Sequence, residues 1–151
     1  MFSVIFPGQG SQSVGMIKEL YDNFAYVKDL FNQADDELGY SISKIILEGP
    51  KEDLDLTENT QPAIFLASYS IFEMIKKEKD IKLENAKYFA GHSLGEYSAL
   101  ATSGSLDFKN AIKLLNERGK AMQTAVPKGT GGMVAVLGAD IKEINNLLEE
   151  N

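Results

Sequence analysis

One eight-residue segment, Phe89 to Glu96, carries the residue types and the spacing of a serine nucleophile. It contains the pattern Gly-x-Ser-x-Gly, with Ser93 between Gly91 and Gly95, and it lies between a predicted strand and a predicted helix. Such a strand-to-helix turn is so sharp that side chains at the two glycine positions would collide, and the serine is held in a strained conformation with its hydroxyl exposed. The pattern predicts that Ser93 is a nucleophile; an ordinary glycine-rich turn is the alternative.

Two backbone N–H groups are candidates for stabilising an oxyanion beside this serine. The helix that follows the turn directs its first amides toward the serine, which makes the N–H of Leu94 one donor. The second comes from the loop after the first predicted strand, Pro7 to Gln12, because such loops form the ligand crevice of an open parallel sheet. Gln9 is flanked there by glycines. The loop lacks the lysine and the glycine spacing of a phosphate loop, and a plain turn is the alternative.

The general base for such a serine is not evident in the sequence. His92 is the only histidine. Neighbouring side chains diverge on a sharp turn, so the residue just before the nucleophile is poorly placed to accept its proton, and a histidine hydrogen-bonded into the sheet edge is the simpler interpretation. The base is therefore either a carboxylate, as in Ser-Asp dyad lipid hydrolases, or a residue on sequence outside this chain.

A further candidate for the functional site is an arginine, Arg118, on an apolar helix face. At 100° per residue, Ala111, Leu115, Arg118 and Met122 fall within about 60° of one another. Burying a guanidinium without an anion is unfavourable by several kcal/mol, so a carboxylate is expected to meet Arg118. That carboxylate belongs either to a protein side chain or to a substrate, which the planar guanidinium would bind through two hydrogen bonds.

These residues require a framework that brings them together, and the hydrophobic pattern predicts one. Strands alternate with helices, which is typical of an α/β layer architecture with a parallel sheet. Strands are expected at residues 3–6, 87–90 and 133–137, with a linker at 126–132. Two helical segments are expected over the apolar residues from Leu20 to Leu38, the second ended by Gly39. Further helices are expected at 60–79 with Thr60 as N-cap and Pro62 in the first turn, at 94–103, and at 108–125 capped by Asp107. A last helix is expected from 141 onward behind a capping box of Asp140 and Glu143. Residues 51–58 are expected to form a loop or at most one helical turn.

Composition excludes several classes of function. The 151 residues include 22 acidic and 15 basic side chains, and the net charge of −7 does not suit nucleic acid. With no cysteine and a single histidine, neither a disulfide framework nor a zinc site is expected. No apolar run approaches the ~20 residues that span a bilayer, and the first residues do not have the pattern of a secretory signal. We expect a soluble, cytoplasmic protein without metal.

The motifs together resemble the malonyl-CoA:acyl carrier protein transacylases, an acyltransferase family of fatty-acid biosynthesis. The resemblance covers the whole chain, in order and in spacing. It rests on Pro7-Gly8-Gln9-Gly10-Ser11-Gln12, Thr60-Gln61-Pro62-Ala63, the segment GHSLGEYSAL at 91–100, Arg118-Gly119-Lys120-Ala121-Met122-Gln123, Ala125-Val126-Pro127 and Gly129-Thr130-Gly131.

The resemblance implies a ping-pong acyl transfer that uses no cofactor. Ser93 would take the malonyl group from malonyl-CoA and pass it to the phosphopantetheine thiol of an acyl carrier protein, with no nucleic acid or membrane as partner. The N–H groups of Gln9 and Leu94 would form the oxyanion hole. Arg118 would bind the malonyl carboxylate, with Gln61 near the acyl pocket.

The resemblance further implies that His92 belongs with the substrate-binding residues. It also implies an α/β-hydrolase-like parallel sheet flanked by helices, here residues 1–127, with an inserted ferredoxin-like subdomain whose first strand and helix are residues 128–151. Family members are roughly twice as long, and their base histidine lies in the second half. This chain is thus expected to be a fragment that is a poor catalyst alone. The alternatives are a Ser-Asp dyad acyl hydrolase and a non-catalytic fragment that acts as an assembly module.

Overall fold

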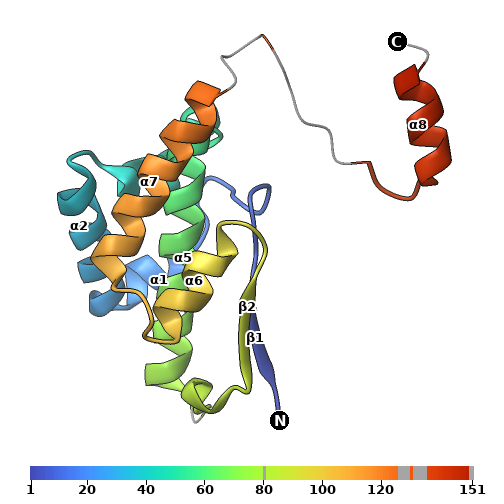
Figure 1. Cartoon of the computed structure of the whole chain (residues 1–151). Coiled ribbons are helices and arrows are strands. Elements are labelled where there is room, and N and C mark those ends of the chain that lie inside the picture. The colour runs from blue at the N-terminus through green and yellow to red at the C-terminus, as the bar shows by residue number, and fades with distance from the viewer. Residues whose placement is uncertain (80, 126–129, 131–135, 150–151) are drawn as a thin grey trace.

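The computed structural model describes residues 1–79, 81–125, 130 and 136–149 as a helix-rich α/β fold in which a small parallel sheet lies against one side of the helices (Figure 1). Along the chain the elements are β1 Ser3–Phe6, α1 Lys18–Asn23, α2 Ala25–Leu38, α3 Ile42–Glu48, α4 Lys51–Leu54, α5 Thr57–Glu78, the 3₁₀ helix η1 Leu83–Asn85, β2 Tyr88–Gly91, α6 Gly95–Thr102, α7 Phe108–Ala125 and α8 Ile141–Glu149. Within these residues no helix combines the length and the apolar character needed to cross a membrane.

The sheet pairs β1 with β2 in parallel, from Ser3 opposite Tyr88 to Phe6 opposite Gly91. The predicted strands at 3–6 and 87–90 are confirmed, the second displaced by one residue toward the C-terminus. One face of the sheet packs on Phe72 of α5, whose ring centroid lies 6.5 Å from that of Phe6. The opposite face is bare, and Ile5 there is 76% exposed. Since parallel sheets are normally covered on both faces, this side of the sheet lacks its usual cover.

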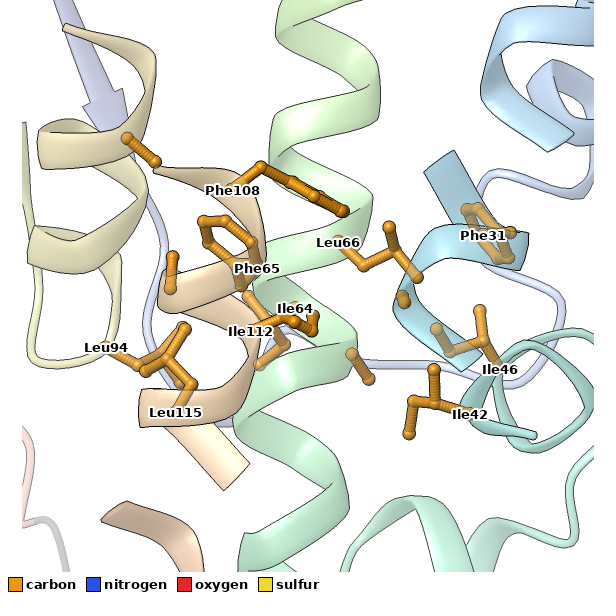
Figure 2. Close-up of a cluster of buried hydrophobic side chains, with 14 of the residues drawn as sticks. Phe31, Ile42, Ile46, Ile64, Phe65, Leu66, Leu94, Phe108, Ile112 and Leu115 are labelled. Carbon is orange, nitrogen blue, oxygen red and sulfur yellow. The ribbon is translucent and has the colours of Figure 1, made fainter. Parts of the chain in front are cut away.

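The core lies between the helices, with α5 at its centre (Figure 2). α5 is buried over most of its length, and α2, α3 and α7 pack around it. In Figure 2, Phe65 of α5 and Phe108 of α7 lie beside each other, and their ring centroids are 5.6 Å apart. α3 was not expected from the sequence. Its apolar residues Ile42 and Ile46 complete the core on the side of α2.

α5 begins three residues earlier than the sequence pattern predicts, so the assignment of Thr60 as N-cap is wrong. Thr60 is fully buried inside the helix, and its hydroxyl donates to the carbonyl of Leu54 over 2.6 Å. Pro62 consequently lies in the second turn, where its missing N–H leaves the carbonyl of Glu58 without its helical partner. The side-chain amide of Asn116 in α7 donates to that carbonyl over 2.9 Å and replaces the lost hydrogen bond.

The other predicted helix ends agree with the structure. Gly39 ends α2 in the left-handed conformation, with φ 73°. The carboxylate of Asp107 accepts from the N–H groups of Lys109 and Asn110 at the start of α7, as an N-cap does. Asp140 caps α8 in the same manner, through the N–H of Lys142. Residues 51–54 form the single turn α4.

A hydrogen-bonded cluster ties α5 and α7 to the segment between α2 and α3. The hydroxyl of Tyr40 donates to Asn59 over 2.9 Å and accepts from Asn116 over 3.1 Å. Burial is the main cause that raises the pKa of Tyr40 to about 12, with Glu58 and Asp35 adding to it. The phenol therefore stays protonated and can donate at any ordinary pH. This cluster fixes the part of α7 that precedes Arg118.

α7 also approaches the first turn of α5 closely at Gly119. A Cβ at Gly119 would lie 2.5 Å from Cα of Glu58 and 2.6 Å from the carbonyl oxygen of Thr57. We expect Gly119→Ala to lower the free energy of unfolding by about 2 kcal/mol, because this clash outweighs the ~1 kcal/mol that alanine adds in helix propensity. Urea unfolding measures the change. Ala121→Gly, on the exposed side of α7, is the matched control for propensity alone, and a Gly119→Ala chain as stable as the unchanged one would contradict the prediction.

The last part of the chain leaves several predictions open. The linker at 126–132 and the strand at 133–137 lie almost entirely outside the described residues, and so does the boundary at 127–128. α8 has no fully buried residue, and it lies apart from the other helices in Figure 1. Its apolar residues remain largely exposed, namely Ile141, Leu147 and Leu148.

Candidate active site

The turn between β2 and α6 has the geometry that the Gly-x-Ser-x-Gly pattern predicts. Ser93 is exposed and has a φ of 55°, in the left-handed region that residues other than glycine rarely adopt. A Cβ at Gly91 would lie 1.9 Å from the carbonyl carbon of Gly95, and one at Gly95 would lie 2.6 Å from the carbonyl oxygen of Phe6. Strand, turn and helix therefore touch through their backbones, and this contact holds the serine in its strained conformation.

Leu94 anchors the turn in the core directly after Ser93. Its side chain is buried, and in Figure 2 it points toward Leu115 of α7. Leu94 is the N-cap of α6. In the part of the chain that the structure describes, no protein acceptor is hydrogen-bonded to the backbone N–H of Leu94 or of Gln9. Both groups keep the donor that an oxyanion hole requires.

The loop after β1 lies against this turn. A Cβ at Gly8 would lie 2.4 Å from Nδ1 of His92, so the residue next to Gln9 contacts the residue next to Ser93. The loop is braced from within by the side chain of Gln12, which accepts from the N–H of Gly10 over 2.8 Å. The structure thus brings the segment that carries Gln9 to the serine, as the sequence predicts.

Gln12 also connects the loop to the helical layer, through Asp55. Its amide donates to the Asp55 carboxylate over 2.9 Å. The ammonium of Lys51, and after it the amide of Gln12, hold the pKa of Asp55 below its usual value. The carboxylate therefore remains ionised and continues to accept from Gln12 at neutral pH.

Arg118 reaches Ser93 directly. One terminal nitrogen, Nη2, donates to the serine hydroxyl oxygen over 3.1 Å, and the other, Nη1, donates to Oε1 of Gln61 over 2.6 Å. Gln61 is fully buried in α5, and its Nε2 donates to the sulfur of Met122 over 3.2 Å. Gln61 and Arg118 are 57 residues apart in the chain, and the packing of α5 against α7 brings them together.

The anion expected beside Arg118 is not a protein side chain in the described ranges 1–79, 81–125, 130 and 136–149. No ion pair joins its guanidinium to a carboxylate there. Arg118 is partly buried, and two of its five N–H groups donate to the neutral acceptors Ser93 and Gln61. A cation with three further donors therefore lies at the serine hydroxyl, and this arrangement can receive a carboxylate.

His92 lies at the sheet edge, but in the described part of the chain its backbone and not its imidazole is hydrogen-bonded there. Its backbone N–H donates to the carbonyl of Phe6 over 3.2 Å and continues the pairing of β2 with β1. Its imidazole lies against Gly8. No hydrogen bond joins this imidazole to Ser93 within the described residues, so the structure offers no serine–histidine pair there. A substrate-binding role of His92 stays a prediction.

Two side chains of this site were missed in the sequence. The ring of Tyr97 in α6 lies beside Arg118, with 5.7 Å from Cζ to the ring centroid. The sequence pattern placed Met122 on the same helix face as Arg118, but the contact of Met122 with Gln61 was not predicted. The signal for Tyr97 was its position one helical turn after Ser93. The described residues contain no group of three or more histidine, cysteine or acidic side chains that could hold a metal ion.

Comparison with known proteins agrees with this geometry. A family model described as an acyl transferase domain matches residues 3–148. The chain is similar to the malonyl CoA-acyl carrier protein transacylase of Haemophilus influenzae, with 48% identity over 149 residues that make up 99% of this chain and 47% of that protein. It is similar to the protein of the same name from Bacillus subtilis, with 44% identity over 97% of this chain and 45% of that protein.

Solved structures give the same result. An acyl carrier protein S-malonyltransferase from Vibrio cholerae is 46% identical, with a TM-score of 0.85 over 99% of this chain and 48% of that one. A malonyl-transacylase in complex with a type II PKS acyl-carrier protein is 44% identical, with a TM-score of 0.88 over 99% of this chain and 47% of that one. The chain spans about half the length of the curated relatives that it matches.

Proposed function

The chain belongs to the acyl transferase domain family, and on this basis we propose that it forms part of a malonyl-CoA:acyl carrier protein S-malonyltransferase of fatty-acid biosynthesis. The observation that carries the proposal is the hydrogen bond between Arg118 and the hydroxyl of Ser93, in surroundings that supply the arginine with no described carboxylate. A nucleophile beside a cation suits an acyl group that ends in a carboxylate. Malonyl is such a group, and acetyl is not.

In the first half-reaction, Oγ of Ser93 attacks the thioester carbonyl carbon of malonyl-CoA. The hydroxyl proton passes to a base, the carbonyl becomes an oxyanion, and the C–S bond then breaks to release coenzyme A and leave a serine ester. In the second half-reaction, the phosphopantetheine thiol of acyl carrier protein attacks this ester and regenerates the serine. The transfer needs no cofactor, because both thioesters have similar free energies.

The roles of the remaining residues follow from their positions. The backbone N–H groups of Gln9 and Leu94 would bind the oxyanion. Arg118 would exchange its hydrogen bond to the serine for two hydrogen bonds to the malonyl carboxylate, while Gln61 keeps the guanidinium in place. His92 would line the entrance beside the loop. Oxyanion stabilisation of this kind contributes roughly 3–4 kcal/mol per donor in enzymes.

The base and the cover of the sheet would come from the part of the relatives that this chain does not span. No described side chain is hydrogen-bonded to Ser93 as a base. The bare face of the sheet, with Tyr88 59% exposed, supports the same idea. We place residues 1–127 in an α/β-hydrolase-like unit and residues 128–151 at the start of a ferredoxin-like subdomain, and we expect a cytoplasmic location.

The proposal is tested by weighing the intact chain after incubation with malonyl-CoA. A malonyl ester is expected on the unchanged chain or, if the base is needed for the first half-reaction, when the second half of the Haemophilus influenzae relative is added. Ser93→Ala is expected to abolish the ester in either arm. Ser105→Ala, an exposed serine beyond α6, is the matched control and is expected to change nothing.

Two outcomes separate this proposal from its rivals. Ester that passes to holo acyl carrier protein supports the transferase, whereas ester that only decays to free malonate indicates an acyl hydrolase. A chain that binds the second half but forms no ester in any arm, while the intact relative forms one, would contradict a catalytic role for Ser93 and favour an assembly module.

A further inference from the structure

The guanidinium of Arg118 lies over the ring of Tyr97, in addition to its hydrogen bonds to Gln61 and Ser93. Its Cζ lies 5.7 Å from the ring centroid of Tyr97, within the range of a cation–π contact. We propose that Tyr97 is a positioning residue that holds Arg118 over Ser93 and so contributes to the choice of a carboxylate-bearing acyl group. This inference rests on the proposed function and assigns a role to a residue that makes no contact with the reacting atoms.

The argument begins with what the hydrogen bonds of Arg118 leave undetermined. The N–H groups of a guanidinium point within its plane, and Gln61 and Ser93 accept from Nη1 and Nη2. Two in-plane contacts do not prevent the plane from tilting about the line that joins them. Arg118 lies at the edge of the core, and Met122 one turn later is 40% exposed, so solvent is available to a guanidinium that tilts away. A ring at the side of the cation restricts this motion.

Tyr97 is itself fixed to the serine. It lies in the first turn of α6, where its backbone N–H donates to the carbonyl of Leu94 over 3.1 Å. Its side chain is partly buried and packs against the core. Ser93 and Tyr97 therefore belong to one rigid turn. The contact with the Tyr97 ring consequently fixes the guanidinium relative to the serine.

The ring supplies this support, and the hydroxyl does not. Among the described residues, the Tyr97 hydroxyl makes no hydrogen bond, whereas the hydroxyls of Tyr26 and Tyr40 do. Phenylalanine presents the same face to a cation. Tyr97→Phe is thus a conservative variant that keeps the contact, and Tyr97→Leu is a variant of similar hydrophobicity that removes it.

Arg118 is the only arginine among the 151 residues, which makes its orientation directly measurable. In a chain labelled with ¹⁵N-arginine, the Nε–H group gives a single side-chain NMR signal. We expect this signal to be displaced upfield by the ring current in the unchanged chain and in Tyr97→Phe. We expect it at the position of a free arginine side chain in Tyr97→Leu. An Nε–H signal that Tyr97→Leu leaves in place would overturn the inference, whether or not the chain forms an ester.

The second readout is the ratio of malonyl to acetyl ester at Ser93, measured under the conditions in which the unchanged chain forms ester. Tyr97→Leu is expected to lower this ratio roughly fivefold, as befits one cation–π contact, and Tyr97→Phe is expected to preserve it. Equal losses for both thioesters in Tyr97→Leu would mean that Tyr97 only stabilises the fold and would overturn the inference. An unchanged chain that forms no ester, either alone or with the second half of the relative, speaks against the proposed function, and the NMR signal still decides whether Tyr97 positions Arg118.

Discussion

Replacing Arg118 with alanine is expected to lower the ratio of malonyl to acetyl ester at Ser93 by about a hundredfold, since two charge-assisted hydrogen bonds to the malonyl carboxylate are lost. Acetyl carries no carboxylate, so acetyl transfer to the serine is expected to continue. The turn that exposes Ser93 is built from the backbones of Gly91 and Gly95 and does not depend on the arginine. Intact-protein mass after incubation with each thioester gives both rates.

Arg118→Lys is the matched control for this prediction. Lysine keeps the positive charge but lacks the planar pair of donors, and it is expected to recover only a small part of the preference for malonyl. An equal loss of both esters in Arg118→Ala would show that the arginine has a structural role only, through its hydrogen bond to the buried Gln61. A full recovery in Arg118→Lys would show that charge suffices and that the two-donor geometry is irrelevant.

The features that the sequence predicted well are those decided by neighbouring residues. The strained turn at Ser93 needs a strand, two glycines and a helix, all within a dozen positions, and the pattern contains each of them. The caps of α2 and α7 likewise depend on Gly39 and on Asp107 alone, within one turn of each helix end. Because the turn and the caps depend on neighbouring residues, the packing of the rest of the chain changes them little.

The start of α5 shows where local reasoning failed. Thr60 followed by Pro62 has the pattern of a helix N-terminus, yet the helix already contains both residues. Two contacts outside this pattern favour the longer helix. Leu54 accepts the Thr60 hydroxyl, and Asn116, 58 residues after Glu58, satisfies the carbonyl that Pro62 leaves open. The second of these contacts requires knowledge of how α7 packs on α5.

The surroundings of Arg118 show the same limit at the site. The helical stripe indicated that a guanidinium faces the core and requires an acceptor, and this was a sound inference from periodicity. The acceptors themselves, Gln61 and Ser93, come from two other elements, and their identity depends on the packing of three helices. Tyr97 was overlooked because an aromatic residue on a helix is usually a core residue, and its partner lies 21 residues farther along the chain.

The largest effect on the fold is expected from Gly91→Ala. An added Cβ would lie 1.9 Å from the carbonyl carbon of Gly95, 2.0 Å from its oxygen and 2.4 Å from the backbone nitrogen of Glu96. All three atoms belong to the backbone, so no change of rotamer relieves the clash. We expect the free energy of unfolding to fall by at least about 3 kcal/mol, a large share of the 5–15 kcal/mol typical of a domain. Urea unfolding followed by circular dichroism measures it.

Gly104→Ala separates this clash from the ordinary effect of replacing a glycine. Gly104 follows α6 with a φ of +80°, and nothing lies within 4 Å of an added Cβ, so alanine there meets only the left-handed strain of about 1 kcal/mol. A Gly91→Ala chain that loses no more stability than Gly104→Ala would show that β2 and α6 can separate at little cost. Close contact between their backbones would then not be what holds Ser93 at its φ of 55°. If the loss is large, the same contact that stabilises the fold also orients the serine, and the two properties cannot be changed independently at this position.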